Sequence, residues 1–190
     1  GPVAVLPRPR PRARGGDRQP VVRRGRCACA AVEDETFDAV VFHTTLCHIP
    51  EPSTALTEAR RVLRSGGRVI VFDGDYETTT VARGETDPLQ ACVRAAVLFL
   101  VHDRFLVRRL PALVIDAGFE SPVLRSHGYV EAPTGGYMLS LLERGIDVLG
   151  ADGTIGRELA QALNGEARRR SDEREFFGHI AYASAIAAKP

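Results

Sequence analysis

The sequence lacks the features that mark a membrane protein, a secreted protein or a dedicated nucleic-acid-binding protein. Its 25 basic and 24 acidic residues nearly cancel, and a net charge of +1 argues against a protein devoted to nucleic acid or to membrane surfaces. No run of about 18 apolar residues occurs, so no transmembrane helix is expected. Pro7 and Arg8 interrupt the N-terminal segment before the apolar region of a signal peptide can form. These absences favour a cytoplasmic protein without a membrane partner.

Cysteine is scarce, and its spacing excludes a zinc-type metal site. Apolar residues make up 44% of the 190 residues, which suffices for one core of ordinary size without disulfides. We therefore expect free thiols in a reducing compartment and no metal centre. The four cysteines are Cys27, Cys29, Cys47 and Cys92.

Lysine is almost absent, and the positive charge is concentrated at the N-terminus. Lys189 is the single lysine among the 25 cations. Residues 1–31 contain eight arginines, five prolines and one acidic residue, so they carry a net charge of +7 and the remainder carries −6. This segment has neither helical nor strand periodicity, which predicts an irregular Arg/Pro-rich arm over residues 1–31 ahead of a domain over residues 32–190.

Three interpretations of this arm remain open. It is a disordered or loosely packed segment, the product of a shifted reading frame in GC-rich DNA, or an arm whose arginines bind nucleic-acid phosphates. Nucleic acid is the less favoured partner, because no aromatic side chain interleaves the arginines to stack on bases. The first residue is Gly rather than Met, which indicates an incomplete or processed chain.

From Val32 onward the sequence predicts an α/β fold. The apolar run 37–42 indicates a buried strand, the segment after Pro50 opens a helix, and residues 68–72 indicate a second strand behind the turn at Gly66. A strand, a helix and a strand within about 35 residues form one parallel unit.

The remainder of the chain predicts alternating helices and strands. Helical spacing covers residues 89–100, 137–149 and 154–170, where Ile155, Leu159, Ala162 and Leu163 are expected to form the inner face of the last helix. Strands are expected around Val123 and over residues 179–188.

Two segments carry a resemblance to a known family. Residues 37–50 read FDAVVFHTTLCHIP, and residues 55–71 read ALTEARRVLRSGGRVIV. This pattern resembles the second half of class I S-adenosylmethionine-dependent methyltransferases, especially the ubiquinone/menaquinone-biosynthesis type (methyltransferase domain type 11), and the resemblance covers roughly residues 32–190. It implies an incomplete Rossmann-like methyltransferase sheet, built from the C-terminal strands with flanking helices. It also implies methyl transfer from S-adenosylmethionine to a small-molecule acceptor.

The resemblance places candidate cofactor residues in the loop after the strand at 37–42. Ligands of open parallel sheets bind beyond the carboxyl ends of the strands, so His43, Thr44 and Thr45 are expected to border the cofactor. His48 is the candidate catalytic base for an acceptor that must lose a proton. The alternative is that His48 only fixes the entry of the helix through a backbone hydrogen bond.

Candidate acceptor residues follow the second strand. Asp73, Asp75 and Tyr76 are expected to line the substrate pocket, or else the two acids merely solvate a turn and the tyrosine packs in the core.

The family's glycine-rich cofactor loop is not recognisable in this chain. The candidate upstream is Gly15–Asp17, which follows no expected strand, so we expect impaired cofactor binding. Without preceding strands, the strand at 37–42 would be an exposed edge, which predicts poor solubility or a homodimer. A non-catalytic fragment or interaction module and an Arg-arm nucleic-acid binder therefore remain alternatives. A nicotinamide dehydrogenase is a weaker one, because its glycine fingerprint is equally missing.

Overall fold

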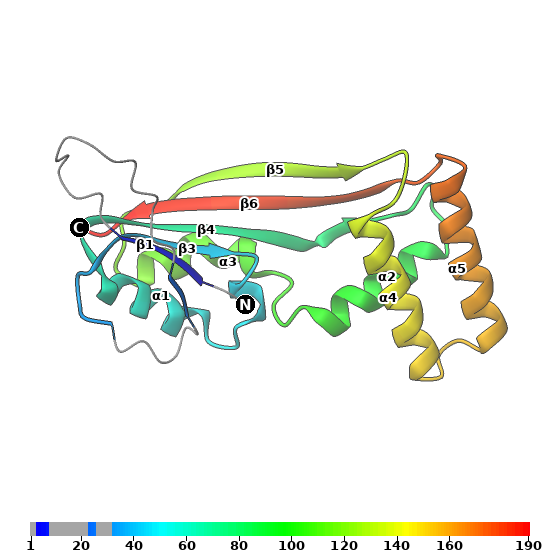
Figure 1. Cartoon of the computed structure of the whole chain (residues 1–190), viewed down its shortest axis with the longest axis horizontal. Helices are drawn as coiled ribbons and strands as arrows, with labels where there is room; N and C mark the ends of the chain where they lie inside the picture. The colour runs from blue at the N-terminus through cyan, green and yellow to red at the C-terminus, as the bar shows by residue number, and fades with distance from the viewer. Residues whose placement is uncertain (1–2, 8–22, 26–31) are drawn as a thin grey trace. The chain divides into compact units, whose positions relative to one another are not determined.

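The computed structural model describes residues 3–7, 23–25 and 32–190 (Figure 1). The strands pair in the order β2-β1-β3-β4-β6-β5. Their bounds are β1 Val3–Pro7, β2 Arg23–Gly25, β3 Phe37–His43, β4 Leu63–Thr80, β5 Val123–Glu131 and β6 Gly178–Ala188. The helices are the 3₁₀ turn η1 Leu46–His48 and α1 Pro52–Val62, α2 Leu89–Leu100, α3 Leu106–Asp116, α4 Tyr137–Ala151 and α5 Arg157–Asp172. The predicted α/β class is confirmed.

The chain divides into two compact units. Unit 1 comprises Gly1–Gly74, Phe105–Ser126 and Ala183–Pro190, and unit 2 comprises Asp75–Arg104 and His127–Tyr182. Strands β4, β5 and β6 each contribute residues to both units. The predicted domain boundary between residues 31 and 32 does not coincide with this division and stays a prediction.

The strand–helix–strand unit predicted from the sequence is present in unit 1. β3 and β4 run parallel, with the register from Ala39 opposite Arg68 to His43 opposite Phe72. Helix α1 begins with Pro52 in its first turn, where the missing amide hydrogen costs nothing. The chain already leaves the helix at Leu63, and Gly66 follows inside β4 with φ +73°.

The core of unit 1 lies where α1 and α3 pack beside the sheet (Figure 1). Leu56 of α1 and Leu110 of α3 are fully buried. Phe42 of β3 and Val69 and Val71 of β4 are buried equally completely. This packing fixes the position of the loop between β3 and α1, because both of its ends are anchored in the core.

Two strands in the N-terminal segment correct the expectation of a wholly irregular arm. β1 pairs antiparallel with β3, and β2 pairs antiparallel with β1. β3 therefore has neighbours on both sides, and the expectation that it forms an exposed edge is wrong: the backbone groups of residues 3–7 satisfy its free side. The rest of the predicted arm, including Gly15–Asp17, lies outside the described residues.

Unit 2 is a layer of three helices beside the continuing strands. α4 packs between α2 and α5. Gly145 allows the close approach of α4 to α2, because a Cβ atom there would lie 1.7 Å from the carbonyl oxygen of Cys92.

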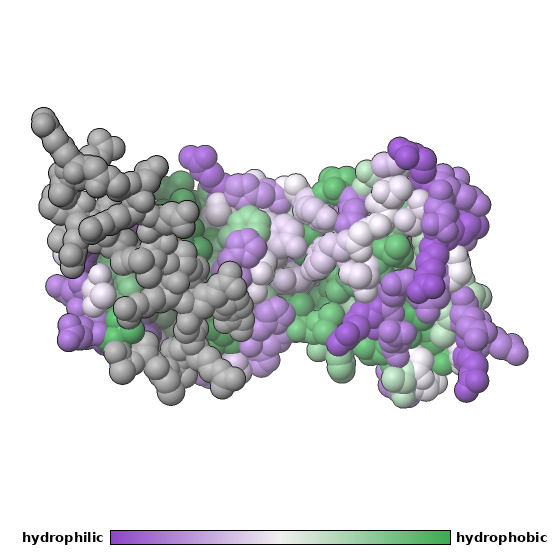
Figure 2. Space-filling view, viewed as in Figure 1, coloured by the Kyte–Doolittle hydropathy of each residue, from purple (hydrophilic) through white to green (hydrophobic). Residues whose placement is uncertain are grey.

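The predicted inner face of α5 is wrong for three of its four residues. Ile155 precedes the helix, and Leu159 and Ala162 are exposed, whereas Leu163 and Ala167 are buried. Charged residues dominate the helix, and Figure 2 shows hydrophilic side chains over α5 and hydrophobic ones over α2 and α4. α5 therefore packs through the narrow apolar contact of Leu163 and Ala167, and two ion pairs, Arg170–Asp87 and Arg168–Glu143, link it to other segments.

The sequence predicts neither a transmembrane helix nor a metal centre, and the structure bears on both for the residues that it describes. Within them, no helix has the length and apolarity needed to cross a membrane. The same residues contain no cluster of three metal-binding side chains. Cys47 and Cys92 are buried and form no disulfide, and burial raises the pKa of the Cys92 thiol, which argues against a nucleophile there. Cys27 and Cys29 lie outside the described residues.

Candidate functional site

The candidate site is the loop from His43 to His48 at the carboxyl end of β3. Thr44 adopts the left-handed conformation with φ +46°, which turns the chain sharply away from the strand. Its backbone amide donates a hydrogen bond of 2.7 Å to the carbonyl oxygen of Phe72, the residue of β4 at which the parallel pairing with β3 ends. The turn therefore places the loop over the carboxyl edge of a parallel strand pair.

His43 and Thr44 present their side chains near the surface of this turn. His43 is exposed, and its ring stacks on Phe72 with the ring centroids 5.1 Å apart. Its Nδ1 lies 3.3 Å from the Thr44 hydroxyl. Both predicted cofactor residues are thus accessible and conformationally restrained.

Thr45 has a different position from the other two predicted cofactor residues. Its side chain is fully buried, and its hydroxyl donates a hydrogen bond of 2.8 Å to the carbonyl oxygen of His43. Its own carbonyl oxygen accepts from the His48 amide at 3.1 Å. Thr45 therefore holds the loop in shape from inside.

Asp73 supports the same loop. This carboxylate is fully buried, and its two oxygens accept hydrogen bonds from the backbone amides of Cys47 at 3.1 Å and of Gly74 at 3.0 Å. Asp73, predicted as a pocket residue, anchors η1 to the middle of β4. The sequence contains no signal for this contact, because its partner is a backbone amide 26 residues earlier.

His48 ends η1 and has an exposed side chain. Its backbone amide is engaged with Thr45, as the alternative interpretation expects. Its imidazole remains open to solvent and to a substrate. Both interpretations of His48 are therefore compatible with its position.

The remaining predicted substrate residues belong to unit 2. Asp75 is half-buried, and its carbonyl oxygen accepts a hydrogen bond from the Thr78 hydroxyl. Tyr76 is buried and lines a small pocket of that unit. Asp73, Asp75 and Tyr76 are thus not brought together within one unit.

A residue that the sequence did not reveal holds the C-terminal end of α1, the helix that follows the loop. Lys189 is buried, and its ammonium group donates to the carbonyl oxygen of Leu63 at 2.6 Å, at the C-terminal end of α1. A cation suits this end of a helix, because unpaired carbonyl groups gather there.

Taken chemically, the loop is a positioning device. It offers the accessible side chains of His43 and Thr44 and the exposed imidazole of His48, on a backbone that buried hydrogen bonds hold in place. Such a site suits a reaction that depends on orientation more than on acid–base chemistry.

Comparison with known families supports the resemblance seen in the sequence. Residues 7–71, which include β3, the candidate loop, α1 and the first part of β4, match the methyltransferase domain family. The matched segment begins at residue 7, upstream of Val32, where the resemblance was predicted to begin.

Three curated relatives show the same likeness. An uncharacterized 37.1 kDa protein in transposon TN4556 of Streptomyces fradiae is 33% identical over 93 residues, which cover 49% of this chain and 27% of that protein. Methyltransferase GfsG of Streptomyces halstedii is 30% identical over 122 residues, covering 63% and 42% of the two chains. The ubiquinone/menaquinone biosynthesis C-methyltransferase UbiE of Roseobacter denitrificans is 30% identical over 112 residues, covering 49% and 43%. This chain spans less than half the length of each of these relatives.

A solved structure extends the likeness to the fold. A candidate methyltransferase from Bacillus halodurans superimposes with a TM-score of 0.55 at 19% identity, over 87% of this chain and 70% of that one. The arrangement of strands and flanking helices is therefore that of the class I methyltransferase fold.

Proposed function

From the premise that residues 7–71 belong to the methyltransferase domain family of the class I, S-adenosylmethionine-dependent type, we propose that this chain takes part in methyl transfer to a small-molecule acceptor. The observation that carries the proposal is the left-handed turn at Thr44, which directs the His43–His48 loop over the carboxyl end of β3, where its parallel pairing with β4 ends. Ligands of parallel α/β sheets bind at such edges.

S-adenosylmethionine is the cofactor that the family match supports, and it supplies a methyl group on a positively charged sulfur. The loop fits such a ligand in part. His43 and Thr44 are accessible and would border it, whereas the hydroxyl of Thr45 is already engaged with His43 and would act by holding the loop. The chain's contribution to the reaction is then orientation of the bound groups.

His48 is the candidate base within this proposal. Its exposed imidazole could accept a proton from an acceptor oxygen, nitrogen or carbon at the step in which that atom gains the methyl group. An acceptor without a proton to lose would not need His48.

We further propose that this chain alone binds the cofactor weakly. Backbone approach to a nucleotide-derived ligand requires a glycine-rich loop behind a strand, and none is recognisable before β3 in the sequence. A homodimer also remains a proposal, although its original reason, an exposed β3, no longer applies.

Calorimetric titration of the full chain with S-adenosylhomocysteine tests both statements. We expect saturable binding that is weaker than micromolar. Thr45→Val should weaken binding further, because the carbonyl oxygen of His43 loses its hydrogen bond, whereas Thr57→Val, which removes an exposed hydroxyl bond within α1, should have no effect.

The outcomes separate the two proposals. Micromolar binding would contradict the impairment and leave the family role intact. No saturable binding at millimolar ligand, by a chain that melts cooperatively, would contradict cofactor use by this chain.

A further inference from the structure

Unit 2 contains a small polar pocket between the end of β4 and one face of α2. Its volume is about 40 Å³, which leaves room for a group of about three non-hydrogen atoms. The α2 residues that line it follow helical spacing and thus share one face of the helix. The lining residues are Tyr76, Glu77, Thr79, Gln90, Arg94, Val97, Leu98 and Arg104.

Most polar groups of the pocket already have structural roles. Gln90 joins α2 to β4, because its amide nitrogen donates to the Thr79 carbonyl oxygen at 2.9 Å and its amide oxygen accepts from the Val81 amide at 3.0 Å. Arg104 is paired with Glu77 at 2.5 Å. These contacts shape the walls and leave little capacity for a ligand.

Two polar side chains in the lining, those of Thr79 and Arg94, do not take part in these structural contacts. Thr79 is 6% exposed, and its hydroxyl has no hydrogen-bond partner among the described residues. Arg94 is exposed and makes no ion pair within the described part of the chain. A buried hydroxyl without a partner is unfavourable, since it has lost its hydrogen bonds to water.

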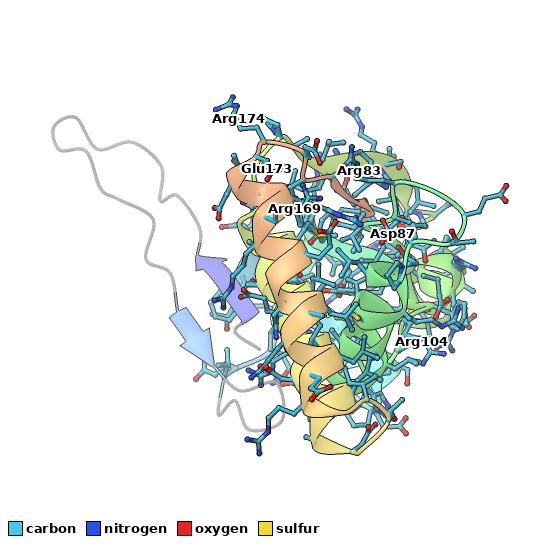
Figure 3. The ribbon with its side chains drawn as sticks, turned by 90° about the vertical axis from the view of Figure 1, so that its right-hand side faces the viewer. Arg83, Asp87, Arg104, Arg169, Glu173 and Arg174 are labelled. Atoms are coloured by element: carbon cyan, nitrogen blue, oxygen red, sulfur yellow. The ribbon has the colours of Figure 1, made fainter. Side chains whose placement is uncertain are left out.

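The charge and shape of the pocket select the class of ligand. Two arginines and one glutamate give its lining a net charge of +1. Val97 and the half-exposed Leu98 add an apolar surface beside the polar groups. Figure 3 labels Arg104 apart from Arg83, Asp87, Arg169 and Glu173, and none of these four residues lines the pocket.

We propose that this pocket binds the carboxylate of a small molecule with a short apolar tail. One carboxylate oxygen accepts a hydrogen bond from the Thr79 hydroxyl, the other pairs with Arg94, and the tail contacts Leu98. A planar carboxylate with two oxygens matches these two donors, whereas a tetrahedral phosphate requires more. The site lies within unit 2 and does not depend on cofactor binding in unit 1.

Titration of the full chain with butanoate, butanamide and inorganic phosphate tests the proposal. We expect saturable binding of butanoate. Calorimetry, or the amide chemical shifts of α2, measures this binding. Butanamide, which has the same shape without the charge, should bind at least tenfold more weakly. Phosphate should also bind more weakly than butanoate.

Substitutions of the two donor residues test whether butanoate binds in this pocket. Arg94→Gln should lower butanoate affinity at least tenfold, and Thr79→Val about five- to tenfold, whereas Thr79→Ser, which keeps the hydroxyl, should retain binding. Arg144→Gln, an exposed position on α4 outside the lining, is the matched control. Equal binding of butanamide, tighter binding of phosphate, or unchanged affinity in a folded Arg94→Gln chain would overturn the proposal.

Discussion

At the scale of single residues, Asp73 is the group on which the shape of the candidate loop most depends. Its two carboxylate oxygens accept from two different backbone amides, and no part of the side chain is exposed to solvent. Buried amides without acceptors are costly, so this side chain supports η1 and the middle of β4 together.

Asp73→Asn should therefore lower the free energy of unfolding by about 1–3 kcal/mol, because an amide side chain retains one acceptor oxygen where the carboxylate has two. It should also speed hydrogen exchange at the amide of Cys47 or of Gly74, because the one remaining oxygen can accept from only one of them. Chemical denaturation and exchange measured by NMR give the two readouts. Glu51→Gln, an exposed position before α1, is the control, and unchanged protection of both the Cys47 and the Gly74 amides would show that Asp73 does not hold the loop.

At this site, the sequence predicted the location of a residue only where that location follows directly from a recognisable strand. His43, Thr44 and Thr45 follow a recognisable strand, and the structure indeed has them at its end. The burial of Thr45 and the contact of Asp73 with Cys47 depend on which segments meet after folding. No local sequence pattern predicts these contacts between distant segments.

At the scale of elements, the N-terminus of α2 is joined to the C-terminal turn of α5 by a buried ion pair. Arg170 donates to both oxygens of Asp87, at 2.6 and 3.2 Å, and the Asp87 side chain is only 4% exposed. Asp87 also accepts from the amides of Arg83 and Leu89. Burial alone would raise the pKa of Asp87, but these hydrogen bonds outweigh it and lower the pKa.

Replacing the buried arginine should cost far more than replacing its exposed neighbour. Arg170→Gln should destabilise the chain by about 3 kcal/mol, because it leaves the Asp87 carboxylate buried without its cation. Arg168→Gln removes a pair with Glu143 in which the arginine is 67% exposed, and should cost about 0–1 kcal/mol. Urea denaturation of both variants measures the difference, and equal costs would contradict a structural role for the buried pair.

The helices and strands were predictable to the extent that apolar periodicity determines them. α1, α2 and α4 bury regular apolar faces, and each begins within two residues of its predicted start. α5 buries Leu163 and Ala167, and two ion pairs link it to other segments, so a prediction based on apolar spacing was wrong for three of the four residues it placed on the inner face. Long-range charge pairing leaves no periodic signal in the sequence.

At the scale of the whole molecule, acid-sensitive groups are distributed unevenly between the two units. Among the described residues, the carboxyl groups whose pKa is lowered are Glu58 in unit 1 and Asp87, Glu131, Asp152, Glu166 and Glu175 in unit 2. The largest of these shifts belongs to Glu166, where hydrogen bonds from Arg169 and Arg170 lower the pKa to about 2.

Acidification should therefore loosen unit 2 before unit 1. A carboxyl group whose pKa is lower in the folded chain stabilises the fold above its ordinary pKa of about 4, and this contribution is lost as the pH falls toward the folded value. Hydrogen exchange followed by mass spectrometry at pH 6 and pH 3, corrected for intrinsic rates, should show a larger loss of protection in α5 than in β3. The difference should shrink in about 0.5 M salt, because several of the pairs are exposed and therefore screened. Equal losses in the two segments, or a difference that salt does not change, would mean that these ion pairs do not determine the acid limit of the fold.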